Sequence, residues 1–443
     1  MIISCILLAF LQAIFVAAIA AAATIPDQSN LGLEGSFSLS VAATSHQSRG
    51  FLRDWAAARQ KWGKGIPKDV ATAFSLLDSN GRVDVQPLGS DDIFIADLEI
   101  GNPPQVVKIA LDTGSSDLWL QSSDTTYFYN RKGPWAPRYH PNMSRTSNIL
   151  KDAEWNVKYS ERKLFKPCNF FYFIPILWQT DSSCIASVDG TAANGIVYLD
   201  TVRLGGFEVR NATIQSALTV ARRFERETGL SGIMGLAKSL PSSIAPPSRT
   251  FLDLLRPQLQ TPVFTADIRL NATGRFDFGR LNESITTDNV TWLGTRDGSD
   301  HWDVGLNLMS WEGSNWWLHD FTATVDTGTT LTFLPDVLAR MYWSDVPGMR
   351  VDPMLSDAFT FPCDGAEKLP DLRFKLPGTE HVLNIPGPYL NYGPIAGDDT
   401  YCWGGMQSAD DLESTIIGGT VLKALFVAFD LETKKVGFAN KRL

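Results

Sequence analysis

The chain has 443 residues, 44% of them hydrophobic and 20% charged, which is enough apolar material for a large core or two domains. This composition excludes intrinsic disorder, whose signature is low hydrophobicity with high net charge. A formal charge of −9 argues against a nucleic acid partner, because a phosphate-binding surface needs a basic patch. Aromatic residues at 11%, with 35 Gly and 24 Pro, favour a mainly β protein.

Residues 1–23 contain no charged side chain and end in a run of alanines. Their length is close to that of a membrane span, but the small residues offer cleavage sites and no basic stop-transfer flank follows. We therefore predict a signal peptide, a secreted (extracellular) protein and no stable membrane anchor. Sequons of the Asn-x-Ser/Thr type agree with this route as candidate glycosylation sites: Asn142, Asn211, Asn271, Asn282 and Asn289.

A polar, loop-like stretch to about residue 47 is expected next, followed by a basic segment. Residues 49–68 carry six basic side chains and one acidic one, whereas residues 89–443 carry 32 basic and 42 acidic. A helix is predicted there because apolar residues recur at helical spacing before a glycine stop: Phe51, Trp55, Ala58, Trp62 and Gly63. A solvated basic helix is the plain alternative. A cationic helix before an anionic body predicts an inhibitory pro-segment, residues 24–88, that acid releases.

From residue 90 the pattern changes to short β-type runs. Residues 93–100 alternate, 101–104 form a turn and 106–111 resume as a strand. Few stretches are helical, with 250–259 and 336–342 as candidates. The predicted class is therefore all-β.

The chain repeats one motif. The run Ala110-Leu-Asp-Thr-Gly-Ser-Ser is echoed by Thr324-Val-Asp-Thr-Gly-Thr-Thr, and each copy is followed later by two apolar residues and a glycine, at 233–235 and 416–418. The same order of signals in both halves predicts two similar lobes, an N-terminal one at 89–262 and a C-terminal one at 263–443.

An apolar strand that leads into Asp, with Gly in the following turn, places a carboxyl at a strand end where a ligand can approach. Two such turns at a pseudo-twofold axis bring Asp112 and Asp326 together. Two close carboxyls share a proton, so that one acts as general base toward water while the other supplies a proton. A two-carboxylate glycoside hydrolase is a rival, but its carboxyls stand about 5–9 Å apart, whereas matched turns favour a closer pair.

The sequence here resembles the pepsin-like aspartic peptidases, and within them the fungal penicillopepsin-like type, from about residue 92 to 443. Several stretches carry the resemblance: Ile100-Gly-Asn-Pro-Pro-Gln, Asp112-Thr-Gly-Ser-Ser-Asp-Leu-Trp, Leu199-Asp-Thr-Val-Arg-Leu-Gly-Gly, Ser231-Gly-Ile-Met-Gly-Leu-Ala, Thr261-Pro-Val-Phe-Thr-Ala-Asp, Val325-Asp-Thr-Gly-Thr-Thr and Val427-Ala-Phe-Asp. It implies a bilobal acid protease fold in which a cleft between pseudo-symmetric lobes binds extended peptide.

The resemblance also implies roles for individual residues. Asp112 and Asp326 look like the catalytic pair, and Lys61 resembles the pro-segment lysine that pairs with it. Residues that would support the pair are Thr113, Ser115, Thr327 and Thr329. Residues that would contact substrate or form the flap are Gly114, Gly328, Tyr159, Asp189, Gly190 and Thr191, with Trp119 as the partner of Tyr159. Cys363 and Cys402 sit where the family closes a disulfide.

One departure from the family pattern concerns the flap. The 28 residues 161–188 separate Ser160 from Asp189, whereas the flap tyrosine and the flap tip are almost adjacent in the family. The insert holds Cys168, Cys184 and an apolar run that a flap over a wet cleft could not hide. It is either a genuine accessory loop or a translated in-frame intron, and we favour the intron, because a long apolar loop inside a tight hairpin is unusual.

These observations predict a secreted aspartic endopeptidase that hydrolyses proteins at acidic pH and prefers apolar residues beside the cut. The resemblance implies catalysis without a metal, a cofactor or a covalent intermediate. Expected partners are protein and peptide substrates and the chain's own pro-segment, and the expected state is a monomer. The alternative is a catalytically impaired binding protein on the same fold, disabled by the flap insert.

Overall fold

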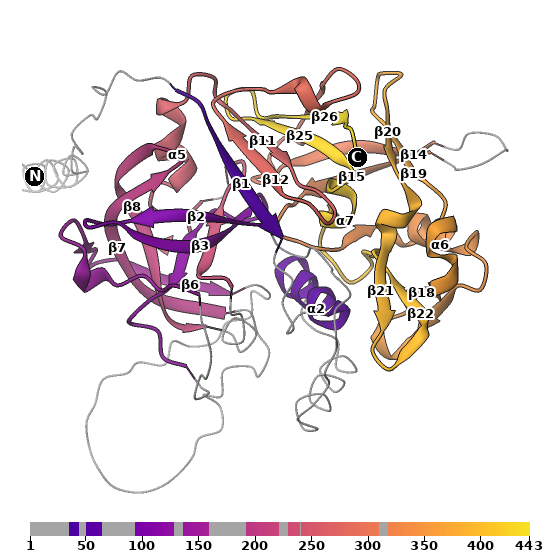
Figure 1. Cartoon of the computed structure of the whole chain (residues 1–443), viewed down its shortest axis with the longest axis horizontal. Helices are drawn as coiled ribbons and strands as arrows, with labels where there is room; N and C mark the ends of the chain where they lie inside the picture. The colour runs from indigo at the N-terminus through magenta and orange to yellow at the C-terminus, as the bar shows by residue number, and fades with distance from the viewer. Residues whose placement is uncertain are drawn as a thin grey trace, which may run out of the picture. The chain divides into compact units, whose positions relative to one another are not determined.

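A computed structural model of the chain describes residues 35–43, 50–63, 94–127, 136–158, 192–220, 229–239, 241–309 and 318–443. Outside these ranges lie the expected signal peptide, the insert 161–188, most of the expected pro-segment, and the flap residues Tyr159, Asp189, Gly190 and Thr191. Within the described ranges, no helix combines the length and the apolar character needed to cross a membrane. The fold is all-β, as predicted, with short helices (Figure 1).

The largest sheet of the described residues has 15 strands. They are β1 (Phe37–Ala43), β2 (Phe94–Ile100), β3 (Gln105–Asp112), β4 (Leu118–Gln121), β5 (Asn148–Ile149), β6 (Glu154–Lys158), β7 (Ala192–Leu204), β8 (Phe207–Val220), β9 (Gly232–Gly235), β10 (Ile244–Ala245), β11 (Val263–Asp267), β12 (Gly274–Phe278), β13 (Thr291–Gly294), β25 (Leu425–Asp430) and β26 (Lys435–Asn440). Its strands come from both ends of the chain, so this sheet joins the two lobes.

Two smaller sheets complete the described part of the C-terminal lobe. A seven-stranded sheet holds β14 (Asp303–Met309), β15 (Leu318–Val325), β16 (Thr332–Leu334), β19 (Leu372–Lys375), β20 (Val382–Ile385), β23 (Met406–Ser408) and β24 (Thr415–Ile417). A four-stranded sheet holds β17 (Arg350–Asp352), β18 (Ala358–Pro362), β21 (Asn391–Ile395) and β22 (Asp398–Gly404).

The helices are few and short. The described α-helices are α2 (Phe51–Trp62), α5 (Phe251–Leu255), α6 (Asp336–Ser344) and α7 (Gly419–Leu422). The 3-10 turns are η1 (Pro141–Met143), η3 (Arg256–Gln258), η4 (Glu283–Ile285), η5 (Pro353–Leu355), η6 (Cys363–Lys368) and η7 (Gly387–Leu390). The three helices expected from the sequence are thus present. Helix α2 ends at the predicted glycine stop, and α5 is extended by η3.

The expectation of a polar loop before residue 47 was wrong, because β1 lies there. Its residues pair with β12, from Phe37 opposite Phe278 to Val41 opposite Gly274, and its end pairs with β2. Figure 1 shows β1 running along β12. Phe37, Leu39 and Val41 are buried, and their alternation with Ser38 and Ser40 is the period of a half-buried strand. The alternation is visible in the sequence, but it is short, it lies in a polar stretch, and its partner strand β12 is far along the chain.

The repeated motif folds the same way in both lobes. In the N-terminal lobe β3, which ends at Asp112, pairs in parallel with β9, and β9 pairs antiparallel with β4. In the C-terminal lobe β15, which ends just before Asp326, pairs in parallel with β24, and β24 pairs antiparallel with β16. Strand β9 contains the first apolar–apolar–glycine echo, and β24 contains the apolar pair of the second, whose Gly418 directly follows the strand. The internal repeat therefore marks equivalent strands.

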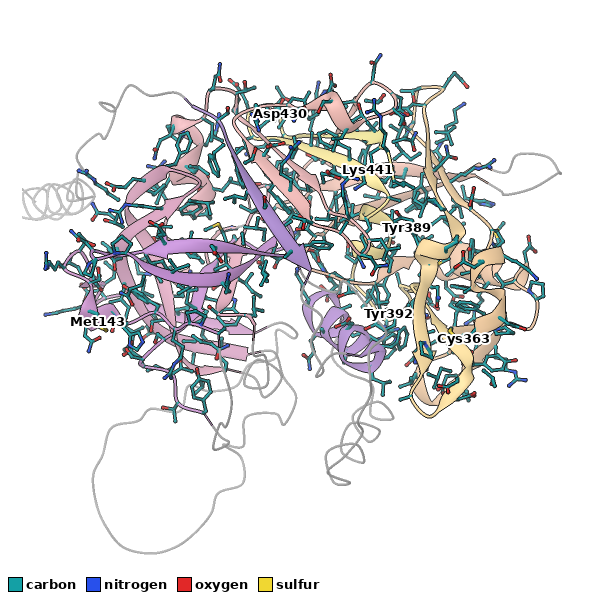
Figure 2. The ribbon with its side chains drawn as sticks, in the orientation of Figure 1. Met143, Cys363, Tyr389, Tyr392, Asp430 and Lys441 are labelled. Carbon is teal, nitrogen blue, oxygen red and sulfur yellow. A yellow bond between two sulfur atoms is a disulfide. The ribbon has the colours of Figure 1, made fainter. Side chains whose placement is uncertain are left out.

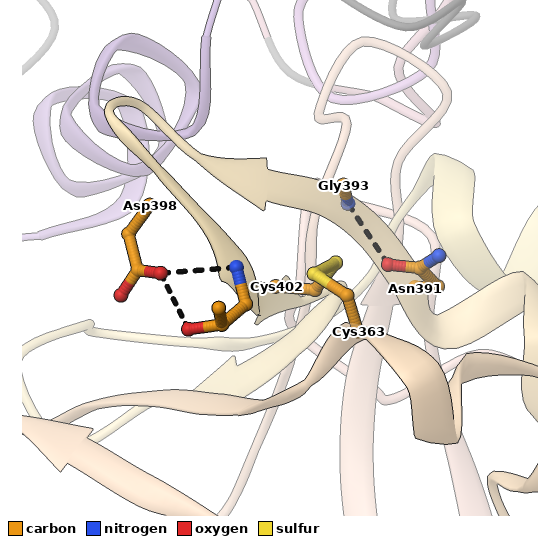
Figure 3. The surroundings of a disulfide bond; sticks show 6 residues. Cys363, Asn391, Gly393, Asp398 and Cys402 are labelled. Atoms are coloured by element: carbon orange, nitrogen blue, oxygen red, sulfur yellow. Dashed lines mark hydrogen bonds between the residues drawn. A yellow bond between two sulfur atoms is a disulfide. The ribbon is translucent and has the colours of Figure 1, made fainter.

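A disulfide joins Cys363, at the start of η6, to Cys402 in β22 (Figure 3). Neighbouring turns are held by local side-chain bonds. Asn391 Oδ1 accepts from the Gly393 amide at 3.0 Å, and Asp398 Oδ1 accepts from the Thr400 amide at 3.0 Å. The bridge between Cys363 and Cys402 confirms the pairing that the family resemblance implied.

Candidate active site

The two Asp-Thr-Gly turns meet, and each brings its glycine against the other's carboxyl. A Cβ atom placed on Gly328 would lie 2.3 Å from Asp112 Oδ1, and one on Gly114 would lie 2.6 Å from Asp326 Oδ1. Only glycine leaves room for this approach. Asp112 and Asp326 are 3% and 0% exposed. The structure thus brings together the two carboxyls that the motif singled out.

Each carboxyl is held by equivalent groups of its own turn. Asp112 Oδ1 accepts from the Gly114 amide at 2.9 Å, and Asp112 Oδ2 accepts from Ser115 Oγ at 2.5 Å. In the second turn, Asp326 Oδ1 accepts from the Gly328 amide at 2.9 Å, and Asp326 Oδ2 accepts from the Thr329 hydroxyl. The two sets of donors orient both carboxyls and leave them facing each other.

Thr113 and Thr327 link the two turns beneath the carboxyls. The Thr113 amide donates to Thr327 Oγ1 at 3.1 Å, and the Thr327 amide donates to Thr113 Oγ1 at 3.0 Å. Each hydroxyl also donates across, Thr113 to the Val325 carbonyl at 2.8 Å and Thr327 to the Leu111 carbonyl at 2.7 Å. Four reciprocal bonds therefore fix one lobe's turn against the other's.

Lys61 of helix α2 lies on the carboxyl pair. Its Nζ is 2.7 Å from Asp112 Oδ1 and 2.9 Å from Asp326 Oδ2. The next residue, Trp62, donates its indole N–H to Asp326 Oδ2 at 3.0 Å and to Thr329 Oγ1 at 3.2 Å. These bonds occupy the acceptors that would otherwise face solvent or substrate, so α2 blocks the site.

The charges at the site shift one another. Burial and the nearby Asp326 carboxylate raise the pKa of Asp112, and Lys61 partly offsets them. Burial also acts to raise the pKa of Asp326, but Lys61 and hydrogen bonds from Asp112 and Thr329 lower it to about 2. Burial would lower the pKa of Lys61, yet the two carboxylates outweigh it and raise that pKa. The pKa values of the two carboxyls therefore differ: Asp112 protonates easily, and Asp326 stays ionised.

Helix α2 also covers an apolar face of the C-terminal lobe. Phe51 stacks on Trp403 with ring centroids 4.2 Å apart, and Tyr392, labelled in Figure 2 beside α2, donates from its hydroxyl to Asp54 Oδ2 at 2.9 Å. The chain then leaves the helix along a loop of the body. The Glu413 amide donates to the Trp62 carbonyl at 2.6 Å, and Gly63 bridges Leu412. The predicted helix is therefore docked rather than solvated.

Trp119, the expected partner of the flap tyrosine, lies in β4 and is 1% exposed. Its ring lies 6.3 Å from that of Trp155 in β6, the strand that leads toward Tyr159. Tyr159 itself lies outside the described residues. The structure therefore places Trp119 at the root of the β6–β7 hairpin.

Sequence reasoning missed two residues beside the carboxyl pair. The sequence marks Trp62 only as an apolar position of a helix and gives His301 no role. The two rings lie 4.8 Å apart in an edge-to-face contact, and burial lowers the pKa of His301. The position of Trp62 directly after Lys61 was a usable signal, whereas nothing in the sequence points to His301.

Comparison with known proteins agrees with this geometry. The family model described as eukaryotic aspartyl protease matches residues 93–165 and 179–441. Podosporapepsin of Podospora anserina is 32% identical over 382 residues, 85% of this chain and 81% of its own. Endothiapepsin of Cryphonectria parasitica is 31% identical, covering 82% and 79%, and Penicillopepsin-3 of Penicillium janthinellum is 28% identical, covering 91% and 92%. The chain belongs to the eukaryotic aspartyl protease family and is a pepsin-like aspartic endopeptidase.

Proposed function

We propose that this protein is made as a secreted precursor and cleaves protein substrates in acid, with Asp112 and Asp326 as its catalytic residues. The observation that carries the proposal is the meeting of the two carboxyls across matched turns, each against the other's glycine. With α2 gone, the pair shares one proton. The ionised carboxyl takes a proton from water, whose oxygen attacks the peptide carbonyl, while the protonated carboxyl gives its proton to the carbonyl oxygen.

The chemistry balances without a covalent intermediate. The tetrahedral species carries the water oxygen, and its collapse breaks the C–N bond as the leaving nitrogen takes a proton from the pair. One peptide bond is lost and one water is consumed. Acid pH suits this cycle because it keeps one carboxyl protonated. The hydroxyls of Ser115 and Thr329 hold the two carboxyls in place.

The precursor form is supported by α2 and β1. Both lie within residues 24–88, the expected pro-segment, and α2 places Lys61 on the two carboxylates. Strand β1 adds pairing with β12 and β2. We infer that this segment is an intramolecular inhibitor, held by ion pairs that weaken when acid protonates the carboxylates.

The secreted route is supported by where the sequons lie. Four sequon asparagines are exposed and Asn282 is half-buried. The Asn282 side chain accepts from the Ser284 amide at 3.1 Å, so its amide side chain is already engaged at a 3-10 turn. We expect glycans on the four exposed asparagines. The proposal also includes a preference for apolar residues beside the cleaved bond.

The test is acid proteolysis of a denatured protein by three forms of the activated protein. Wild type should cleave it, whereas Asp112→Asn and Asp326→Asn should each lose activity by at least about a hundredfold, the scale of general acid–base catalysis. Both variants are isosteric, so their unfolding should remain cooperative. Chelators should not reduce wild-type cleavage. Full activity in either variant would overturn the assignment of that carboxyl.

A further inference from the structure

Helix α2 places a second cation, two residues before Lys61, on the C-terminal lobe. Arg59 is 2% exposed, and its Nε lies 3.6 Å from Asp411 Oδ2. Its guanidinium lies over the ring of Trp55 in the same helix, 3.2 Å from the centroid, and its other aromatic contact is with Phe333 of the body, 5.6 Å from the ring centroid. Burying an arginine is costly unless its charge is compensated. The body of the protein must therefore offer a surface suited to this side chain.

The surface that receives Arg59 has an apolar floor and an acidic rim. Phe333 lies in β16, the strand that follows the Asp-Thr-Gly turn of Asp326, and is 0% exposed. Around it cluster Leu331, Ala409 and Ile416 of the body, packed against Trp55 and Ala58 of α2. Asp411 stands in the turn between β23 and β24 with its side chain 42% exposed. An apolar floor beneath a half-exposed carboxylate suits a long stem with a charged end.

Within the described ranges, Asp411 has an ion pair with Arg59 and with no basic side chain of the body. The nearby Arg340 is committed to Asp336 and Asp357. When the pro-segment leaves, Asp411 loses its cation and Phe333 loses the atoms that cover it. Release of the pro-segment therefore uncovers a carboxylate and an aromatic ring together, on the face of the body that α2 covers.

We propose that Phe333 and Asp411 form a substrate subsite for a basic side chain, which Arg59 fills in the precursor. This inference rests on the proposed function, because it concerns the active peptidase. A substrate Arg would lay its guanidinium near the Phe333 ring and pair with Asp411, two interactions that favour a cation over a neutral side chain of similar length. The enzyme would then prefer apolar residues directly beside the cleaved bond and a basic residue at one nearby position.

The experiment measures kcat/KM of the activated enzyme on matched peptides. Each peptide has a central Phe-Phe bond and carries Arg at one flanking position in turn, with a counterpart that carries norleucine there. At one position wild type should prefer Arg over norleucine by about tenfold, from an ion pair and a cation–π contact together. Asp411→Asn should reduce that ratio several-fold, to the part that the Phe333 ring contributes, and the loss of kcat/KM should be larger for the Arg peptide than for the norleucine peptide.

Asp410→Asn is the matched control, because Asp410 is the exposed neighbour in the same turn and Arg59 does not pair with it among the described residues. It should keep the wild-type ratio. Asp411→Lys should reverse the preference toward a peptide with Glu at that position. The proposal is overturned if wild type shows no Arg preference at any position, or if Asp411→Asn keeps it. If wild type cleaves neither kind of peptide, the proposed function itself is wrong.

Discussion

Thr113 and Thr327 exchange hydrogen bonds across the two lobes, each amide donating to the other's hydroxyl at 3.1 and 3.0 Å. The two residues are 214 positions apart in the chain. Their hydroxyls then donate to the Val325 and Leu111 carbonyls of the opposite lobe. Asp112 and Asp326 are the neighbouring residues in the chain, so the separation of their carboxyls depends on this link.

We expect Thr327→Val to destabilise the protein by about 1–3 kcal/mol, because the Thr113 amide and the Leu111 carbonyl lose their partner. Thr327→Ser keeps the hydroxyl and should cost much less. A double-mutant cycle with Thr113→Val, read by chemical denaturation, should give a coupling of about 0.5–3 kcal/mol. Strict additivity of the two Val substitutions would show that the reciprocal bonds contribute nothing as a pair.

The second prediction concerns how acid would loosen the proposed pro-segment. The pKa of Asp112 is raised by burial, so this carboxyl takes a proton first as the pH falls, and Lys61 loses one partner. The pKa of Asp326, about 2, lies below its unfolded value, so its contribution is present above about pH 4 and is lost as the pH falls to about 2. The raised pKa of Lys61 gives a contribution that is complete below about pH 10 and does not change in acid.

Lys61→Met removes the cation that lowers the pKa of Asp326, and it leaves the pro-segment without its contact to the carboxyl pair. The precursor should therefore shed its N-terminal 80–90 residues at a higher pH than wild type does. Mass spectrometry after stepwise acidification measures the pH at half-conversion. Lys108→Met is the control, because Lys108 pairs with Asp97 at an exposed site and should leave this pH unchanged. Equal midpoints for Lys61→Met and wild type would contradict the role of Lys61.

The third prediction concerns the disulfide between Cys363 and Cys402, which are 39 residues apart. On the chain-entropy estimate, closing a loop of this length stabilises the fold by about 4 kcal/mol. The variant Cys363→Ala with Cys402→Ala should lose about 2–5 kcal/mol in denaturant unfolding, measured against wild type under non-reducing conditions. Reduction of wild type should reproduce the loss, and reduction of the double variant should have no effect.

The sequence predicted the all-β class from short alternating runs. It predicted the internal repeat and the carboxyl pair because the Asp-Thr-Gly motif occurs twice. It did not predict β1, since Phe37, Leu39 and Val41 gain their meaning only from pairing with β12 far along the chain. The sequence did not predict that the Trp62 indole donates to Asp326, or that His301 packs against the Trp62 ring. Those contacts exist only because α2 docks on the site, which is a tertiary event.

The last prediction concerns the insert 161–188, whose two flanking strands form a regular pair. In the β6–β7 hairpin, Trp155 lies opposite Gly195 and Lys158 lies opposite Ala192. Residues 159–191 connect them, 33 in number, and removal of the 28 in the insert would leave five. Five residues is an ordinary hairpin connection. The family model also breaks off within the insert, leaving 166–178 unmatched, a stretch that includes the apolar run.

A chain that lacks 161–188 should therefore be the better enzyme. Closing the longer loop costs entropy, and the apolar run of the insert favours association between copies. The shortened and full-length forms are to be expressed in parallel, activated in acid and compared for cleavage of a denatured protein and for the fraction that stays soluble. A same-length replacement of 161–188 by a Gly/Ser sequence separates the effect of loop length from that of apolar character. If the full-length form equals the shortened one in both activity and solubility, the insert is a genuine accessory loop.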